Sequence, residues 1–107
     1  MLKRPARHLY VIKLSKGVLK KKKFVQRNPN YDGRRPCLYV GLTGLTPEER
    51  FEQHKNGVKS CVYVQQSGKR LLPSLGRRTR KSHGKALKLE RELAVRLRNQ
   101  GYAVWQG

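Results

Sequence analysis

The apolar residues of this chain fall in short runs, and these runs limit what the chain can fold into. Three of them are rich in aromatic and β-branched residues: HLYVIKL from His8 to Leu14, CLYVG from Cys37 to Gly41, and CVYVQ from Cys61 to Gln65. Runs of this kind predict β-strands. None approaches the ~20 apolar residues that a membrane-spanning helix needs. The last residues, YAVWQG, predict a further strand at an edge of the sheet.

Two segments carry helical signals. Thr46, Pro47 and Glu49 form a capping box with proline at the first helical position, so a helix is expected to begin there and to end at Gly57. The second signal is an apolar stripe with a period of about 3.6 residues. It ends at Gly101 and consists of Ala86, Leu89, Leu93, Ala94 and Leu97.

Between these elements lie two basic segments that are rich in turn-forming residues. Segment 15–36 is expected to be a loop or a mobile hairpin, and segment 67–84 to be a loop. At 107 residues the chain has room for one domain, spanning 1–107. The sequence therefore predicts a small α/β or α+β domain, with a three- to four-stranded, mainly antiparallel central sheet flanked by helices.

The charge balance indicates a polyanionic partner. The chain has 26 Lys and Arg but only six Asp and Glu, a formal net charge of +20. Each phosphate that a cation neutralises releases a condensed counterion, so such a protein binds nucleic acid without regard to sequence. We expect DNA rather than RNA, contacted by basic residues of the two loops: Lys20, Lys21, Lys22, Lys23, Arg77, Arg78, Arg80 and Lys81.

Two alternatives to nucleic acid remain open: an anionic membrane surface, and an inhibitor-type adaptor that uses the polybasic loop. Lys13 interrupts the first apolar run too early for a secretory signal. We therefore expect a cytoplasmic or nucleoid-associated protein that does not enter a membrane.

The two cysteines, Cys37 and Cys61, lack the paired spacing of a zinc knuckle. In a reducing compartment they are expected to pack as small apolar groups. A disulfide or a metal site is the alternative.

Glu90 is a lone carboxylate on the apolar stripe of the C-terminal helix. A buried carboxylate is costly, which favours a functional role such as holding a divalent cation. The alternative is a salt bridge to a neighbouring base on the same helix, such as Lys85, Lys88 or Arg96.

The order of certain residues resembles the GIY-YIG nuclease family. The first motif reads His8-Leu9-Tyr10, with His8 in the place of the family's first glycine. The second reads Tyr39-Val40-Gly41-Leu42-Thr43, with Leu42 where the family is often basic or polar. Arg50 and His54 follow in RFEQH, and Glu90 comes late in the chain. The resemblance runs from His8 to about Trp105. The late asparagine of the family lacks a clear counterpart, although Gln106 is a candidate.

The resemblance implies a metal-dependent endonuclease that hydrolyses DNA phosphodiesters and is structure-selective or weakly sequence-specific. Glu90 would hold one Mg²⁺ or Mn²⁺ per site, and the catalytic residues would be Tyr10, Tyr39, Arg50 and His54. Gly41 and Thr43 would shape the motif backbone. A tyrosine or His54 would act as the base. A homodimer or a partner protein would help to choose the substrate. The competing hypothesis is a non-catalytic nucleic-acid-binding protein on the same or a similar scaffold.

Overall fold

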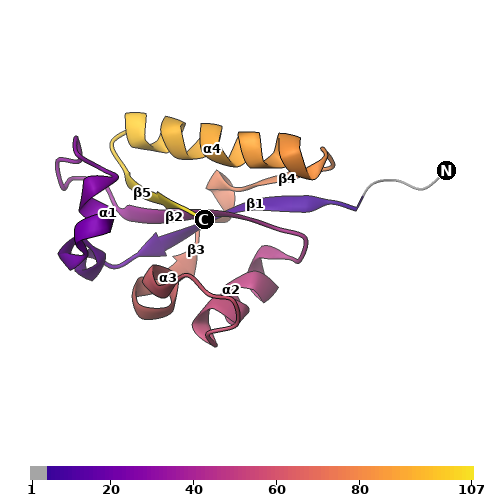
Figure 1. Cartoon of the computed structure of the whole chain (residues 1–107), viewed down its shortest axis with the longest axis horizontal. Helices are drawn as coiled ribbons and strands as arrows, with labels where there is room; N and C mark the ends of the chain where they lie inside the picture. Colours follow the sequence, from indigo (N-terminus) through magenta and orange to yellow (C-terminus); the bar gives the residue numbers. More distant parts are fainter. Residues whose placement is uncertain (1–4) are drawn as a thin grey trace.

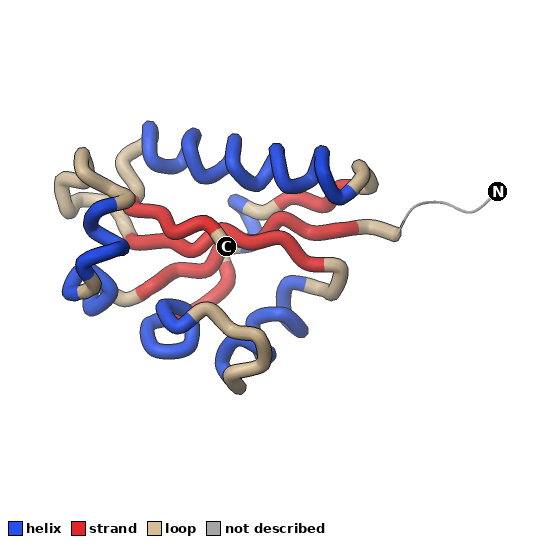
Figure 2. Tube along the Cα trace, in the orientation of Figure 1, coloured by secondary structure: helices blue, strands red, loops and turns tan. Residues whose placement is uncertain are grey.

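The computed structural model describes residues 5–107, which form a mixed five-stranded β-sheet with helices on both faces (Figures 1 and 2). The strands are β1 (Arg7–Leu14), β2 (Cys37–Thr43), β3 (Gly68–Leu71), β4 (Arg77–Thr79) and β5 (Ala103–Gln106). Their order is β3-β1-β2-β5, and β4 pairs with β1 beside β3. Only the β2–β5 pair is parallel. The predicted fold class is confirmed, with more strands than expected.

The helices divide between the two faces of the sheet. Helix α4 (His83–Asn99) covers one face, and α1 (Lys22–Gln26), α2 (Pro47–Lys55) and α3 (Val62–Ser67) lie on the other (Figure 1). Two short 3₁₀ helices complete the chain, η1 (Lys16–Lys20) and η2 (Pro73–Leu75). The predicted capping box of α2 is confirmed: Thr46 Oγ1 accepts from the Glu49 N–H, and the Glu49 carboxylate accepts from the Thr46 N–H, both at 3.2 Å.

Alternation along β1 decides which side chains face which helices, because successive residues of a strand point to opposite faces. Leu9 and Val11 pack in a cluster with Leu93, Ala94 and Leu97 of α4. Tyr10, Ile12 and Leu14 pack in the other cluster, under α1 and α3. Tyr10 therefore points to the face that also carries α2.

Segment 15–36 is more ordered than the expected loop, because it contains η1 and α1. Val18 and Phe24 are both fully buried and hold this segment to the sheet. The Phe24 ring stacks on Trp105 with 6.4 Å between centroids, and meets Tyr63 edge-on at 5.8 Å. The four lysines from Lys20 to Lys23 are all exposed around this buried pair.

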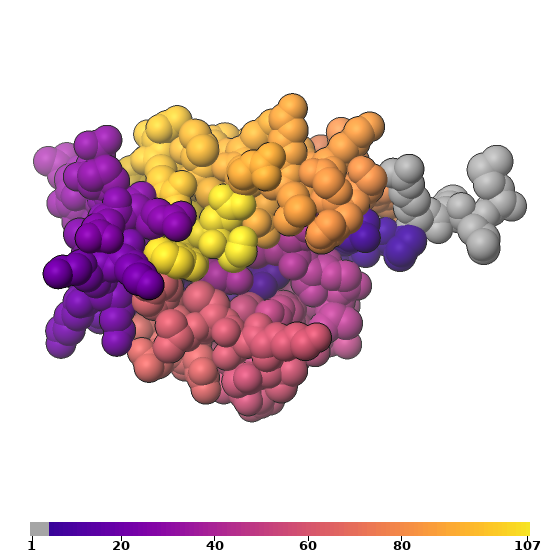
Figure 3. Space-filling model, viewed as in Figure 1, coloured from indigo at the N-terminus to yellow at the C-terminus, as the bar shows by residue number. Residues whose placement is uncertain are grey.

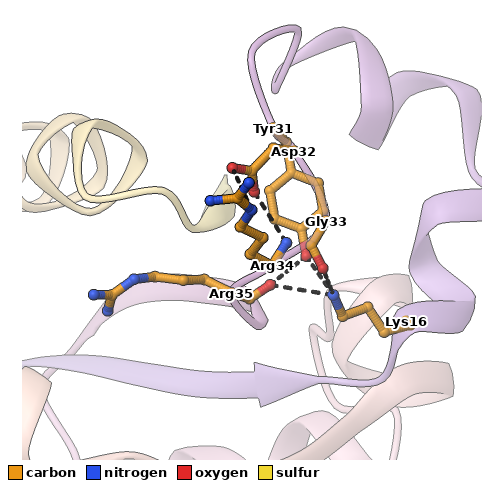
Figure 4. A network of polar contacts seen from close by, with 6 residues as sticks. All are labelled: Lys16, Tyr31, Asp32, Gly33, Arg34 and Arg35. Atoms are coloured by element: carbon orange, nitrogen blue, oxygen red, sulfur yellow. Dashed lines mark hydrogen bonds and ion pairs between the residues drawn. The ribbon is translucent and has the colours of Figure 1, made fainter.

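The chain between α1 and β2 is fixed by the ammonium group of Lys16 (Figure 4). Lys16 Nζ donates to Tyr31 Oη at 2.7 Å, to Gly33 O at 2.6 Å and to Arg35 O at 3.3 Å. The Tyr31 hydroxyl in turn donates to Arg35 O. Lys16 thus acts as a structural cation that sets the path into β2.

The predicted strand over Cys61 to Gln65 is wrong, because this segment begins α3. Tyr63 and Val64 are neighbours and are both buried, whereas Val62 is 48% exposed. A strand on one face of the sheet would bury alternate residues only. Packing against one side of the core therefore overrides the β-propensity of the two valines.

Segment 67–84 is also more regular than the expected loop, because β3 and β4 lie within it. Both are antiparallel to β1: β3 pairs with its second half and β4 with Arg7 to Leu9. The free edge of β1 offers unpaired N–H and C=O groups, and a polar segment satisfies them as well as an apolar one.

The outer edge of β5 is closed by a side chain instead of a strand. Asn28 is buried, and its Oδ1 accepts from Val104 N at 2.7 Å while its Nδ2 donates to Val104 O at 3.1 Å. Asn28 Nδ2 also donates to Phe24 O at 2.8 Å, and Arg98 Nε donates to Asn28 Oδ1 at 3.2 Å. One amide thus ties α1, β5 and α4 together.

Cys37 is buried and Cys61 is partly buried, and neither is in a disulfide, in agreement with the expected packing role. Within residues 5–107, no helix combines the length and the apolar character needed to cross a bilayer.

Candidate functional site

Two tyrosines and a histidine from three different elements meet on the α2 face of the sheet. Tyr10 of β1 and Tyr39 of β2 have ring centroids 6.0 Å apart. His54 of α2 lies 6.1 Å from Tyr10 and 5.2 Å from Tyr39, measured between centroids. His54 is fully buried, and the two tyrosines are 2% and 5% exposed. Three of the predicted site residues therefore form one buried cluster.

Gly41 determines where the Tyr10 hydroxyl points. Tyr10 and Gly41 are directly opposite each other in the antiparallel β1–β2 pair. A Cβ at Gly41 would lie 2.5 Å from the Tyr10 hydroxyl oxygen and 2.8 Å from Cε1. Because glycine has no Cβ, the phenol ring crosses over β2. Its hydroxyl is thereby directed toward the place where β5 ends, since Gln106 pairs with Val40, the residue before Gly41.

The hydrogen bonds of His54 define its tautomer. The backbone N–H of Cys61 donates to His54 Nδ1 at 3.1 Å, so Nδ1 carries no proton. In the neutral ring the proton is then on Nε2, which lies 2.9 Å from Tyr10 Oη. His54 therefore donates a hydrogen bond to the Tyr10 oxygen. This arrangement makes His54 a partner that stabilises a phenolate at Tyr10, and leaves Tyr10 as the group able to take up a proton.

Acid is expected to destabilise the fold through His54. Burial, with a smaller effect of the Arg50 charge, lowers the pKa of His54 to about 4. Between that value and the unfolded pKa of ~6.5, protons bind the unfolded chain and not the folded one, so the free energy of unfolding should fall by about 3 kcal/mol as the pH drops from 6.5 to 4. Urea unfolding at several pH values measures this change. A His54→Gln variant should lose most of the dependence on pH in that window, and an equal dependence in both proteins would contradict the assignment.

The two phenols differ in how strongly they resist ionisation. Burial raises the pKa of Tyr10, and hydrogen bonding by Tyr39 together with the charge and hydrogen bonding of Arg50 opposes the rise. Burial raises the pKa of Tyr39 much further, and Tyr10 adds to that rise. Of the two hydroxyls, Tyr10 is therefore the one better placed to lose its proton.

Arg50 lies one turn before His54 on α2 and is firmly held. Its Nη1 donates to Gln53 Oε1 at 3.0 Å and to Val58 O at 3.1 Å, and its Nη2 donates to Lys59 O at 2.8 Å. Lys59 has a positive φ of 44°, which turns the chain around the guanidinium. None of these partners is an anion. The positive charge of Arg50 is therefore not neutralised by them and acts on the neighbouring Tyr10.

Glu90 is 3% exposed on α4, and its partner is an amide. Gln106 Nε2, at the end of β5, donates to Glu90 Oε1 at 2.9 Å. Among the described residues, the expected alternative partners Lys85, Lys88 and Arg96 form no ion pair with it. Burial raises the pKa of Glu90, while the Gln106 hydrogen bond and the charges of Arg91 and His83 lower it.

Glu90 and the phenols share one electrostatic environment although α4 lies on the other face of the sheet. The charge of Glu90 contributes to the raised pKa of both Tyr10 and Tyr39. The end of β5 links them, because Gln106 bonds to Glu90 and the next residue, Gly107, lies against the Tyr39 hydroxyl. In the space-filling view the C-terminal residues lie at the surface, between α4 and the segment that carries α1 (Figure 3).

A divalent cation at this place would have few protein ligands. Within residues 5–107 there is no group of three or more His, Cys, Asp or Glu side chains that could enclose a metal ion. Mg²⁺ commonly binds through one or two carboxylates and completes its shell with waters and substrate phosphates. Glu90, with one oxygen oriented by Gln106, matches that pattern and does not match an all-protein cage.

The remaining predicted residues lie around or away from this cluster. Thr43 Oγ1 accepts from Leu45 N at 3.1 Å, and His8 Nδ1 donates to Leu45 O at 3.1 Å, so both order the turn that leads to α2. The two basic segments, with Lys20 to Lys23 at η1 and α1 and with Arg77, Arg78, Arg80 and Lys81 at and after β4, lie at opposite ends of β1 (Figure 1).

Sequence reasoning missed two polar contacts at this site and its border. The Cys61 N–H that sets the His54 tautomer belongs to the backbone and leaves no signal in the sequence. Asn28, which positions β5, stands in an Asn-Pro-Asn stretch that indicates only a turn.

Comparison of the chain with protein-family models, with curated proteins and with solved structures found no match.

Proposed function

We propose that this protein is a metal-dependent endonuclease that hydrolyses DNA phosphodiester bonds. The observation that carries the proposal is the buried cluster of Tyr10, Tyr39 and His54, which the end of β5 connects to Glu90 through Gln106 and Gly107. A single neutral amide compensates a buried carboxylate only in part, which favours a role for Glu90 in holding a cation.

In this proposal Tyr10 takes the proton of the attacking water. His54 donates to the Tyr10 oxygen, and Arg50 places a fixed positive charge beside it, so both stabilise the phenolate over the phenol. Tyr39 remains protonated and donates its hydrogen bond to Tyr10, which adds to the stabilisation of the phenolate. With Gln53, Val58, Lys59 and Tyr10 as partners, one N–H group of Arg50 is left for the phosphate.

Glu90 would hold the Mg²⁺ or Mn²⁺ ion, which supplies positive charge to a phosphate oxygen when it is bound. Gln106 keeps the carboxylate turned toward the end of β5 by its hydrogen bond to Oε1. Protonation competes with metal binding at a carboxylate. Because burial raises the pKa of Glu90, metal affinity should decline at a higher pH than for an exposed carboxylate.

The lysines from 20 to 23 and the basic residues from 77 to 81 would contact DNA phosphates on two sides of the site. They offer charge without an evident arrangement for reading bases, so the choice of substrate would depend on DNA shape, on a partner protein or on a second copy of the chain. These contacts predict a strong dependence of affinity on salt.

The experiment compares the parent protein with Glu90→Gln on supercoiled plasmid and on branched DNA, with Mg²⁺, with Mn²⁺ and with a chelator. Gln keeps the size of the side chain and removes the charge that binds the metal. We expect the variant to bind DNA as the parent does and to cleave at least about 100-fold more slowly, because a lost metal ligand removes charge stabilisation at the scissile phosphate.

The same experiment separates this proposal from its alternative. Binding by both proteins without cleavage of any substrate, whatever the metal, would favour a non-catalytic nucleic-acid-binding protein. Equal, metal-dependent cleavage by both proteins would exclude Glu90 as the metal ligand. Glu92→Gln is the matched control, because this exposed acid lies on the same helix.

A further inference from the structure

A cavity of about 170 Å³ lies between the chain that follows α1 and the C-terminal end of α4. It is separate from the tyrosine and histidine cluster. Its lining includes two arginines, Arg27 and Arg98, together with asparagine and tyrosine side chains, and none of the described residues that line it is acidic. A polar cavity with two cations and no anion is an unusual feature, because nearby like charges repel each other.

Arg98 is half-buried in this cavity and is held by neutral groups only. Its Nε donates to Asn28 Oδ1 at 3.2 Å, and its Nη2 donates to Val104 O at 2.9 Å. A guanidinium has five N–H donors, so most of them are not used in these two bonds. Burial and the charge of Arg27 both lower the pKa of Arg98, which means that the site lacks a compensating negative charge.

The guanidinium groups of Arg27 and of a neighbouring arginine, Arg35, are each held by an aromatic ring. Arg27 lies over the Trp105 ring, 5.1 Å from its centroid, and Arg35 lies over Tyr102 at 4.9 Å. Arg35 Nη1 also donates to Tyr102 Oη at 2.8 Å. A ring orients a guanidinium without neutralising it.

The acid nearest in sequence does not supply the missing charge. Asp32 forms an ion pair with Arg34 at 3.7 Å and accepts from the Arg34 N–H at 3.0 Å, as Figure 4 shows. Arg27 and Arg98 thus line the cavity, Arg35 lies against Tyr102 at its border, and none of the three forms an ion pair among the described residues.

We propose that this cavity binds a phosphate group, which the planar forks of Arg98 and Arg27 grip through paired N–H donors. Its position suggests where such a phosphate comes from. Asn28, which lines the cavity, is hydrogen-bonded to Val104 of β5. Gln106, the partner of Glu90, is two residues further along the strand, and the rise of a strand puts roughly 7 Å between Val104 and Gln106. A nucleic-acid strand lying along β5 would place one phosphate here and another beside Glu90.

The test uses Trp105, the one tryptophan of the chain, as a reporter because Arg27 lies on its ring. The parent protein is titrated with inorganic phosphate while Trp105 fluorescence is recorded. It is then titrated by anisotropy with a labelled single-stranded oligonucleotide that carries either a 5′-phosphate or a 5′-hydroxyl. A chelator is present throughout, so that the result does not depend on metal binding or cleavage and stands apart from the test of nuclease activity.

The variant Arg27→Gln removes the guanidinium of an exposed residue that lines the cavity. Arg96→Gln is the control, because it removes an exposed arginine of α4 that does not line the cavity. We expect Arg27→Gln to weaken oligonucleotide binding about tenfold, the effect of losing hydrogen bonds between charged groups. Arg96→Gln should weaken it by no more than about twofold, because it removes only a distant charge. Arg98→Lys keeps the charge and removes the fork, and should resemble Arg27→Gln.

The oligonucleotide and phosphate experiments identify the source of the group. A preference for the 5′-phosphorylated oligonucleotide that disappears in Arg27→Gln assigns the site to a terminal phosphate. Equal weakening for both oligonucleotides assigns it to a backbone phosphate, and a fluorescence response to inorganic phosphate alone assigns it to a free phosphate. The proposal is overturned if Arg27→Gln and Arg96→Gln weaken binding equally and inorganic phosphate leaves Trp105 fluorescence unchanged.

Discussion

Tyr10→Phe is expected to slow DNA cleavage by a factor of about 100 to 10,000, the range for loss of a general base. The substitution removes the oxygen that accepts from His54 Nε2 and keeps the ring that packs over Gly41. Metal binding by Glu90 and DNA binding should stay close to those of the parent. The measurement is the single-turnover cleavage rate at saturating DNA and metal.

Two further variants test whether a loss of cleavage in Tyr10→Phe reflects the role of Tyr10 as the base. Tyr63→Phe is the matched control: Tyr63 is also buried, but it packs on Phe24 and Trp105 away from His54, so its rate should be unchanged. If Tyr39→Phe lost activity while Tyr10→Phe kept it, the base would be Tyr39 and the role given to His54 would be wrong.

The pH dependence of cleavage by the parent protein also tests whether Tyr10 is the base. Burial raises the pKa of Tyr10, so at neutral pH only a small fraction is phenolate, and that fraction grows about tenfold per pH unit below the pKa. The cleavage rate should therefore rise with pH through the neutral range, and Tyr10→Phe should flatten the rise.

Asn28→Ala is expected to lower the free energy of unfolding by roughly 3 kcal/mol. It removes four hydrogen bonds and leaves the Val104 N–H without a partner at the edge of β5, while the Val104 C=O keeps only its bond from Arg98. Urea denaturation measures the change. Asn30→Ala, an exposed asparagine of the same turn, should cost less than about 0.5 kcal/mol. Equal small losses in both variants would show that β5 does not depend on this clamp.

The parts of the fold that the sequence predicts well are those with a local signal. The capping box at Thr46 and the apolar stripe through Leu93 are each encoded within a few residues, and the structure has both helices. The strand that contains Tyr39 is a nearly continuous apolar run without alternation, as expected for a strand that is covered on both faces.

The parts that escaped prediction depend on distant partners. Strands β3 and β4 form from a basic segment because β1 presents an open edge, which no property of residues 67–84 reveals. Helix α3 forms where a strand was expected because the core takes Tyr63 and Val64 from the same side. Both outcomes are decided by tertiary packing and not by local propensity.

At the candidate site the residue types could be predicted but their chemistry could not. The spacing of Arg50 and His54 on one helix face was evident from the sequence, whereas the direction of the His54 hydrogen bond follows from a backbone N–H seven residues away. Glu90 could be singled out as a costly acid, while its amide partner Gln106 is apparent only once β5 lies beside β2.

A crystal structure of the protein soaked in Mn²⁺, with anomalous diffraction recorded to locate the ion, tests most directly whether the phenols, the imidazole and the carboxylate form one metal-dependent site. We expect an anomalous peak about 2.1 Å from a Glu90 carboxylate oxygen, with waters filling most of the shell on the side of Tyr10 and Tyr39. A well-ordered Glu90 that remains bonded to Gln106 with no metal beside it, at Mn²⁺ concentrations that support cleavage, would contradict the proposal.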